Sequence, residues 1–394
     1  IIDSSFISNK AISYSTSSQR GGIGGAIYNG APEGNNKVAL LKVIAQNTDV
    51  LFKDNVASGA SGMSFGGAMA NDNFGQLTLE TNGKSIIFTG NSATYGGAVS
   101  NAASGNNGGA LTSVTSYLQI SAVNGNIIFQ NNKSDKEGGA LFNYSDATGA
   151  YLHVADGYSL IMSGNTSADG GAISNSASPR DPDSFGYLTM QIGDNGTIDL
   201  SQNTATGNGG AINNLGQIDI KSLDSAKTSF LNFSENTAEK GGAIFNNKIL
   251  KGDLKNASAI SFNGNVATGG VGGAIYNTTD GKIDIKLSGT SKLVFQTTSD
   301  DVYNLGNIKI TGDSPNPSTI NVVLTGGALP TSVSSSSTQI VVNSTLGGTG
   351  TYEISTTQLN LGSTGYIDYS PVMKLSNNNI NLAENSYLNL DTGD

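Results

Sequence analysis

The sequence predicts a right-handed parallel β-helix, a solenoid in which each coil contributes about three short strands. One unit recurs along the chain: a large apolar residue, two variable residues and Asn, then a polar link, Gly-Gly-Ala, an aliphatic residue and, two positions on, a second Asn. Short segments of alternating polarity lie between the units, and no stretch has a convincing helical period. Because one such unit cannot bury its own apolar face, the units must stack.

Eight copies of the unit occur, and their apolar anchors are 29 to 46 residues apart. That length is suited to one coil, with the variation placed in loops. Met162 and Leu200 replace Phe in two copies, and the copies that begin at Phe6 and Phe52 have longer links. The remaining four copies supply the main candidate residues, which are Phe88, Asn91, Gly96, Gly97 and Ala98; Phe129, Asn132, Gly138, Gly139 and Ala140; Phe233, Asn236, Gly241, Gly242 and Ala243; and Phe262, Asn265, Gly272, Gly273 and Ala274.

The motif residues are candidates for either a structural or an adhesive role, and stacking favours the structural one. Equivalent residues of neighbouring coils lie about 4.8 Å apart. We therefore expect Phe88, Phe129 and Phe233 to form one buried stack, each contributing roughly 1.5–3 kcal/mol through burial. The Asn that follows each Phe is expected to form a corner ladder of amides. Gly-Gly allows a turn and close backbone approach, and Ala fits a narrow interior.

The repeat pattern changes after Phe295. Asp300 to Gly306 occupies the place of a Gly-Gly-Ala unit, and the following sequence is rich in Ser and Thr. We predict a β-helix of eight repeats over residues 1–306 and a less regular continuation or cap over 307–394. A terminal coil needs such a cover because it exposes unpaired backbone groups.

Composition excludes several classes of protein. The formal net charge is −10, with 20 basic and 30 acidic residues, so no basic stripe is present for nucleic acid or anionic membrane. Cysteine is absent, which excludes disulfides, thiol nucleophiles and cysteine metal sites. The chain begins at Ile1 and has no apolar run of about 20 residues. We expect a mature or excised fragment that does not itself insert into a membrane.

No catalytic, metal or cofactor site is predicted. His153 is the only histidine, and no Ser–His–Asp arrangement can be assembled around it. Paired carboxylates of the kind that lyases and glycosidases use occur among turn residues, where Asp is common for local hydrogen bonding. The closest such pairs are Asp181 with Asp183, Asp300 with Asp301, and Asp135 with Glu137.

The paired motifs Phe-x-x-Asn and Gly-Gly-Ala-[Ile/Leu/Val] resemble the repeats of chlamydial-type polymorphic outer membrane proteins. The resemblance covers about residues 6–306. Members of that family are autotransporters with β-helical passengers, so it implies type V secretion, surface display, virulence and adhesion to host cells. The family's frequent cysteines are missing here.

The resulting hypothesis is an adhesin at the bacterial cell surface, associated with the outer membrane or secreted, that binds a host-cell surface protein or glycan. If the motifs are interior, adhesion falls to outward residues and loops, for which 31–36, 102–107 and 176–183 are the candidates. One alternative is a structural surface-layer or filament protein that associates with itself. A second is a β-helical polysaccharide lyase or glycosidase.

Overall fold

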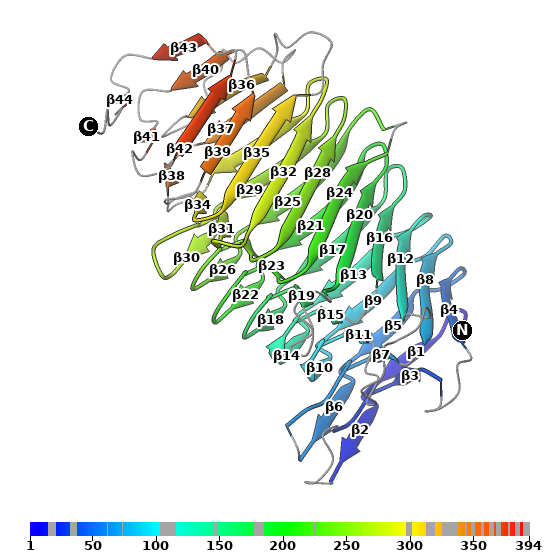
Figure 1. Cartoon of the computed structure of the whole chain (residues 1–394). Helices are drawn as coiled ribbons and strands as arrows, with labels where there is room; N and C mark the ends of the chain where they lie inside the picture. The colour runs from blue at the N-terminus through cyan, green and yellow to red at the C-terminus, as the bar shows by residue number, and fades with distance from the viewer. Residues whose placement is uncertain are drawn as a thin grey trace.

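The computed structural model is a parallel β-helix whose chain passes through four parallel sheets, coil after coil (Figure 1). The fold class predicted from the repeats is confirmed. Residues 1–312 are described except 15–20, 32–37, 61, 73, 103–115, 145–148, 177–184, 224–225 and 297–301, and beyond 312 only the strands are described, without their side chains. We number the sheets 1 to 4 in the order in which the chain visits them.

Sheet 1 carries the apolar anchors, and sheet 2 follows the first Asn of each unit. Sheet 1 consists, in spatial order, of β1 (Ser5–Ile7), β5 (Val50–Lys53), β9 (Ile86–Thr89), β13 (Ile127–Gln130), β17 (Ser159–Ser163), β21 (Gly196–Ser201), β25 (Ser229–Ser234), β29 (Ala259–Asn263), β33 (Lys292–Gln296), β37 (Thr338–Val342), β36 (Ile320–Leu324), β40 (Gln358–Leu361) and β43 (Asn379–Leu382). Sheet 2 consists of β2 (Lys10–Ser13), β6 (Val56–Gly59), β10 (Ser92–Tyr95), β14 (Lys133–Glu137), β18 (Thr166–Ser167), β22 (Thr204–Ala205), β26 (Thr237–Ala238) and β30 (Val266–Ala267).

Sheet 3 follows Gly-Gly-Ala, and sheet 4 holds the alternating segments. Sheet 3 consists of β3 (Ile27–Asn29), β7 (Met69–Asp72), β11 (Val99–Ala102), β15 (Leu141–Tyr144), β19 (Ile173–Ser176), β23 (Ile212–Asn214), β27 (Ile244–Asn246), β31 (Ile275–Asn277), β34 (Val302–Asn304), β38 (Thr345–Gly347), β41 (Tyr366–Ile367) and β44 (Tyr387–Leu388). Sheet 4 consists of β4 (Ala39–Ala45), β8 (Gly75–Thr81), β12 (Tyr117–Ala122), β16 (Gly149–Val154), β20 (Tyr187–Ile192), β24 (Gln217–Ser222), β28 (Ile249–Leu254), β32 (Lys282–Leu287), β35 (Asn307–Gly312), β39 (Thr351–Ser355) and β42 (Val372–Ser376).

Each coil up to β32 therefore has four strands, one more than the sequence suggested. The additional strands are those of sheet 2, and four of them are only two residues long. They form because the polar link after each corner Asn pairs with the same link in the next coil, where the sequence had indicated no strand. The prediction of three strands missed them because two residues are too few to show a period of two.

The described strands are arranged differently toward the C-terminus. Among them, sheet 2 extends to β30, whereas sheets 1, 3 and 4 continue through strands beyond residue 307. In sheet 1 the chain forms β36 before β37, but β37 lies next to β33 and β36 lies next to β40. The division of the chain at residue 306 stays a prediction.

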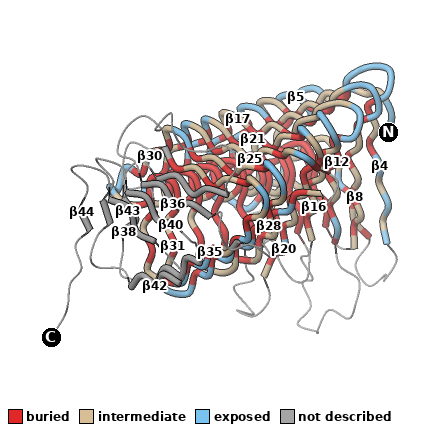
Figure 2. Tube along the Cα trace, turned by 90° about the horizontal axis from the view of Figure 1, so that it is seen from above, coloured by how far each residue is buried: buried red, intermediate tan, exposed pale blue. Residues whose placement is uncertain are grey.

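The apolar anchors form one column on the inward face of sheet 1. The buried residues of the solenoid are red in Figure 2. Phe88 stacks on Phe129 with ring centroids 4.6 Å apart and planes 2° apart. The Phe rings form two runs and not one. Met162 and Leu200 lie between Phe129 and Phe233 in the same register. Phe88, Phe129 and Phe233 thus lie in one buried column as expected, with Met162 and Leu200 in the two positions between Phe129 and Phe233.

The first Asn of each unit forms the predicted corner ladder. In each bond an amide Nδ2 donates to the Oδ1 of the equivalent Asn in the next coil, at 2.8 to 3.1 Å. That Oδ1 also accepts the backbone N–H of the preceding Asn, as Asn132 does from Asn91 at 3.0 Å. The ladder therefore provides hydrogen-bond partners for backbone groups that would otherwise have none at the corner. Its members are Asn9, Asn55, Asn91, Asn132, Asn165, Asn203, Asn236 and Asn265.

The two glycines of the motif have different roles. The first has a left-handed backbone in all eight units, with φ between 63° and 70°, which favours glycine. The second lies directly under the next coil: a Cβ on Gly139 would overlap the backbone carbonyl oxygen of Gly171. Both the turn and the close approach that the sequence indicated are thus present.

Candidate binding surface

The motif residues predicted as structural or adhesive candidates lie inside the solenoid. In the four full repeats the Phe, Asn and Ala side chains are all buried. The glycines contribute only backbone, at the corner between sheets 2 and 3. A ligand that approaches the folded chain therefore meets other residues first.

A second Asn ladder was missed by the sequence reasoning. It runs along sheet 3, where each Nδ2 donates to the Oδ1 of the next coil at 2.7 to 2.9 Å. The signal was present, because each unit has an Asn two residues after the aliphatic residue. Its members are Asn29, Asn71, Asn101, Asn143, Asn175, Asn214, Asn246, Asn277 and Asn304.

His153 lies on the outer face of sheet 4, in β16. Its ring stacks on Tyr151, with centroids 5.9 Å apart, and its Nδ1 has no hydrogen-bond partner. Burial lowers the pKa of the imidazole, and the nearby Asp156 carboxylate opposes this shift only in part. The imidazole ring is therefore neutral at pH 7. It is part of an aromatic surface, and no carboxylate of the described residues accepts a hydrogen bond from its Nδ1.

Of the predicted carboxylate pairs, only Asp135 with Glu137 falls within the described residues. Asp135 is exposed, whereas Glu137 is half-buried and its Oε2 accepts a hydrogen bond of 2.7 Å from Ser174 Oγ. Burial raises the pKa of Glu137, and hydrogen bonds from Ser174 and Ser176 oppose that shift. Within the described part of the chain, no three His, Asp or Glu side chains are grouped to hold a metal ion. Asp181 with Asp183 and Asp300 with Asp301 lie outside it.

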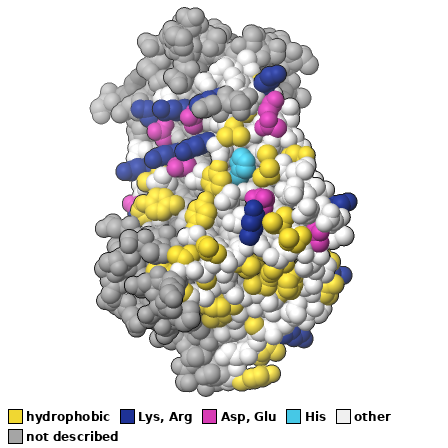
Figure 3. Space-filling model, turned by 90° about the vertical axis from the view of Figure 1, so that its right-hand side faces the viewer, with side chains coloured by type: hydrophobic (Ala, Val, Ile, Leu, Met, Phe, Trp, Pro, Cys, Tyr) yellow, Lys and Arg dark blue, Asp and Glu magenta, His cyan; other side chains and the backbone are white. Residues whose placement is uncertain are grey.

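The outer face of β12, β16 and β20 carries an uncharged cluster that we call the tyrosine patch. These strands pair in register, so their outward residues form three rows of three. Tyr117 and Tyr187 are 38% and 48% exposed. Figure 3 shows this face, with hydrophobic side chains gathered around the single histidine. The nine positions are Tyr117, Gly149 and Tyr187; Gln119, Tyr151 and Thr189; and Ser121, His153 and Gln191.

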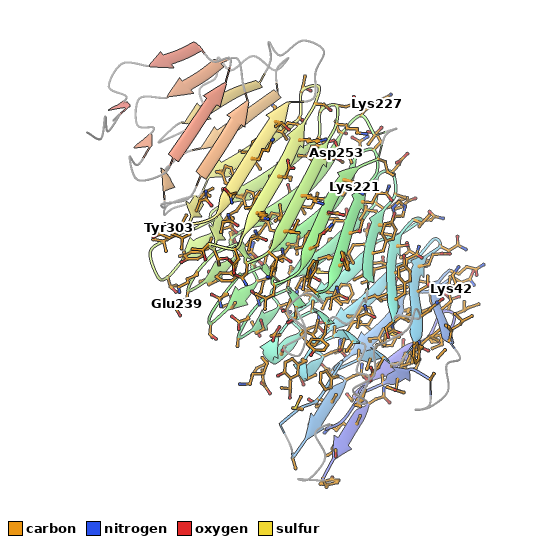
Figure 4. The ribbon with its side chains drawn as sticks, viewed as in Figure 1. Lys42, Lys221, Lys227, Glu239, Asp253 and Tyr303 are labelled. Carbon is orange, nitrogen blue, oxygen red and sulfur yellow. The ribbon has the colours of Figure 1, made fainter. Side chains whose placement is uncertain are left out.

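Further along sheet 4 the same outward positions are charged and alternate in sign from coil to coil. Lys221 pairs across the strands with Asp253, and both are labelled in Figure 4. Opposite charges on neighbouring strands attract, by roughly 0.2–1 kcal/mol per pair. The two alternating rows are Asp219, Lys251, Asp284 and Lys309, and Lys221, Asp253 and Lys286.

The three candidate adhesive loops share one place in the fold. Each connects a strand of sheet 3 to the next strand of sheet 4: β3 to β4, β11 to β12, and β19 to β20. Residues 32–36, 103–107 and 177–183 of these loops lie outside the described residues. Two of the loops lead into the strands that begin with Tyr117 and Tyr187.

The fold and its interior columns define a class of protein, a passenger-like parallel β-helix assembled from short stacked repeats. Residues 126–144, 197–215 and 230–247 match the model of the Chlamydia polymorphic membrane protein (Chlamydia_PMP) repeat. Each match extends from a strand of sheet 1 to the second ladder Asn, so the chain carries repeats of this family, as its motifs suggested. Searches among curated proteins and solved structures returned no match. Within the described residues, no helix has the length and apolarity needed to span a membrane.

Proposed function

We propose that this chain is the passenger region of a bacterial surface adhesin, delivered by type V secretion and displayed at the outer membrane or released from it. The polymorphic membrane protein repeats and the β-helix support this assignment. Adhesion would make the protein a virulence factor. The partner is a host-cell surface molecule.

One observation carries the adhesive part of the proposal: the inward positions repeat while the outward positions vary. Interior columns keep the same residue type over many coils, because each side chain packs or bonds with its counterpart. Outward positions of sheet 4 in a single register differ from coil to coil, from the charged Lys42 through neutral residues to charged residues again. Such a rod can vary its outer surface without disturbing its core, as binding solenoids do. That outward register reads Thr78, Gln119, Tyr151, Thr189, Asp219 and Lys251.

Binding of the purified, fluorescently labelled chain to cultured host cells tests the proposal. We expect saturable binding that unlabelled chain competes away. The matched control has residues 103–107 and 177–183 scrambled, which leaves the motif residues in place, and circular dichroism verifies that both proteins are folded. Reduced binding of the scrambled chain assigns adhesion to the loops and the surface beside them. A folded chain that does not bind host cells contradicts the proposal.

The alternating charges on sheet 4 favour a second candidate, self-association of the solenoids into a surface layer or filament. A row of alternating positive and negative side chains is complementary to the same row on a second, shifted copy of the chain. Within one chain, neighbouring charges of the row also attract each other. Sedimentation velocity over a range of concentrations tests this at low and high salt. Concentration-dependent assembly that salt weakens would support it, because salt screens exposed charges. A monomer at every concentration contradicts it.

A further inference from the structure

We propose that the tyrosine patch is a subsite for a neutral glycan of two or three sugar units. The proposal rests on the adhesive function above and names the chemical class of its ligand. Four properties of the patch support it: its shape, its hydrogen-bonding groups, its lack of charge and its size.

The shape of the patch comes from a glycine between two exposed tyrosines. Tyr117, Gly149 and Tyr187 occupy one register on three successive strands, so the backbones of the two tyrosines are about 9.6 Å apart, two strand spacings. Among the described residues, a Cβ on Gly149 would come within 4 Å of the Tyr117 ring alone, at 3.7 and 3.9 Å. A pyranose ring fits a gap of this width, with its C–H groups against the aromatic faces.

Hydrogen-bonding groups border this gap. Gln119 Nε2 donates to Ser121 Oγ at 2.9 Å, and the Tyr151 hydroxyl donates to Gln191 Oε1. These bonds hold both amide side chains on the outer face. The carbonyl oxygen of Gln119 and the amide nitrogen of Gln191 retain bonding capacity. Oriented acceptors and donors beside aromatic rings suit a ligand that carries many hydroxyl groups and apolar C–H faces.

The lack of charge favours a neutral ligand. None of the nine side chains is charged at pH 7, since burial keeps His153 neutral by lowering its pKa. Charged side chains border the patch: the ion pair of Lys42 and Glu80, at 3.0 Å, lies on one side, and Asp219 and Lys221, which pair in register with Thr189 and Gln191, lie on the other. The nine positions themselves therefore offer no cation to a sialic acid or a sulfate group, and Lys221 at the border lies opposite Asp253 on the next strand. A neutral sugar does not need a cation.

The size of the patch favours a glycan over a protein. Three strands span about 14 Å and four residue steps about 13 Å, which gives an area on the order of 200 Å². A stable protein interface buries about 800 Å² on each partner. The uncharged area is thus too small for a protein partner by itself, and it matches a short oligosaccharide.

An array of neutral mammalian oligosaccharides, printed beside sialylated and sulfated versions of the same chains, is the direct test. We expect the folded chain to bind neutral members and the variant Gly149→Gln to bind them at least tenfold more weakly, because its side chain fills the gap. The double variant Tyr117→Ser/Tyr187→Ser should lose binding as well. Tyr14→Ser is the matched control, since Tyr14 is 84% exposed and lies on the first coil. All variants should keep the unfolding midpoint of the original chain.

Three results would overturn the glycan subsite: no binding to neutral oligosaccharides, binding only to the charged versions, or equal binding by folded Gly149→Gln. Host-cell binding separates this failure from that of the adhesin proposal. If the chain binds cells and the patch variants bind equally well, or if protease but not glycosidase treatment of the cells abolishes binding, the subsite is wrong and adhesion stands. If the folded chain does not bind cells, the adhesive function itself fails.

Discussion

The interior columns and the outer face of sheet 4 obey different rules, although both belong to the same stacked coils. In the interior, Phe52, Phe88 and Phe129 follow one another with ring centroids 4.6 Å apart. On the outer face, Tyr117 is followed in the next coil by Gly149, which has no side chain at all. The difference arises because an interior side chain contacts its own counterpart, whereas an outward one also contacts water. The interior therefore fixes residue type, and the outer face leaves it free to serve binding.

Adding one methyl group should greatly destabilise the interior and leave the outer face almost unaffected, and this is the largest difference we expect. Gly139→Ala places a Cβ on the backbone carbonyl oxygen of Gly171, so the coils must separate. We expect a loss of more than about 4 kcal/mol in the free energy of unfolding, or failure to fold. Gly149→Ala on the outer face should change it by less than about 0.5 kcal/mol. Urea denaturation measures both, and similar losses would refute the contrast.

Truncation of an interior ring should have the next largest effect. Phe129→Ala removes a ring that is stacked on Phe88 and packed in register against Met162, and we expect a loss of about 3–5 kcal/mol. The matched control is Ile128→Ala, because Ile128 is adjacent and faces outward in the same strand. Thermal unfolding compares the two midpoints. A change within error for Phe129→Ala would contradict the stacked interior.

Loss of one ladder amide should cost somewhat less. Asn132→Ala deprives the buried Asn91 of the acceptor for both its backbone N–H and its Nδ2. Because an unsatisfied buried donor costs about 1–3 kcal/mol, we expect a loss of roughly 2–4 kcal/mol. Hydrogen exchange should also show the Asn91 amide losing protection. Exposed Asn82→Ala is the control, and an equal effect there would remove the special role of the ladder.

Glu137 is half-buried, so it belongs neither to the buried columns nor to the exposed face. Its replacement should change the stability of the chain least. Burial raises its pKa above the ordinary 4.5, so the folded chain holds a proton at pH values where the unfolded chain has released it. The ionised carboxylate thus opposes folding at neutral pH, and this penalty is absent below the ordinary pKa. Glu137→Gln should therefore raise the unfolding midpoint at pH 7 and leave it nearly unchanged at pH 4. An equal rise of the unfolding midpoint at both pH values would show that ionisation of Glu137 is not its cause.

The sequence predicted the inward half of the molecule better than the outward half. Phe-x-x-Asn and Gly-Gly-Ala recur, so the interior columns, the first Asn ladder and the glycine corner could all be derived from spacing. The second ladder was missed although Asn101 and Asn143 recur in the same way, because the Asn after the aliphatic residue was recognised as part of the repeat but was given no role. The column that holds Phe129 and Phe233 could be derived in the same way, because Met162 and Leu200 replace Phe in the two intervening copies.

What the sequence determined by itself is the repeat: which residues face inward, how the corners form, and that the coils must stack. Only the tertiary structure determined which outward residues become neighbours. Tyr117, Gly149 and Tyr187 are 32 and 38 residues apart in the sequence and share no motif, yet they lie side by side. The physical reason is that stacking brings each coil to about 4.8 Å from the last whatever the length of its loops. Contacts on the outer face therefore depend on the register of the strands, and the spacing of residues in the sequence does not reveal them.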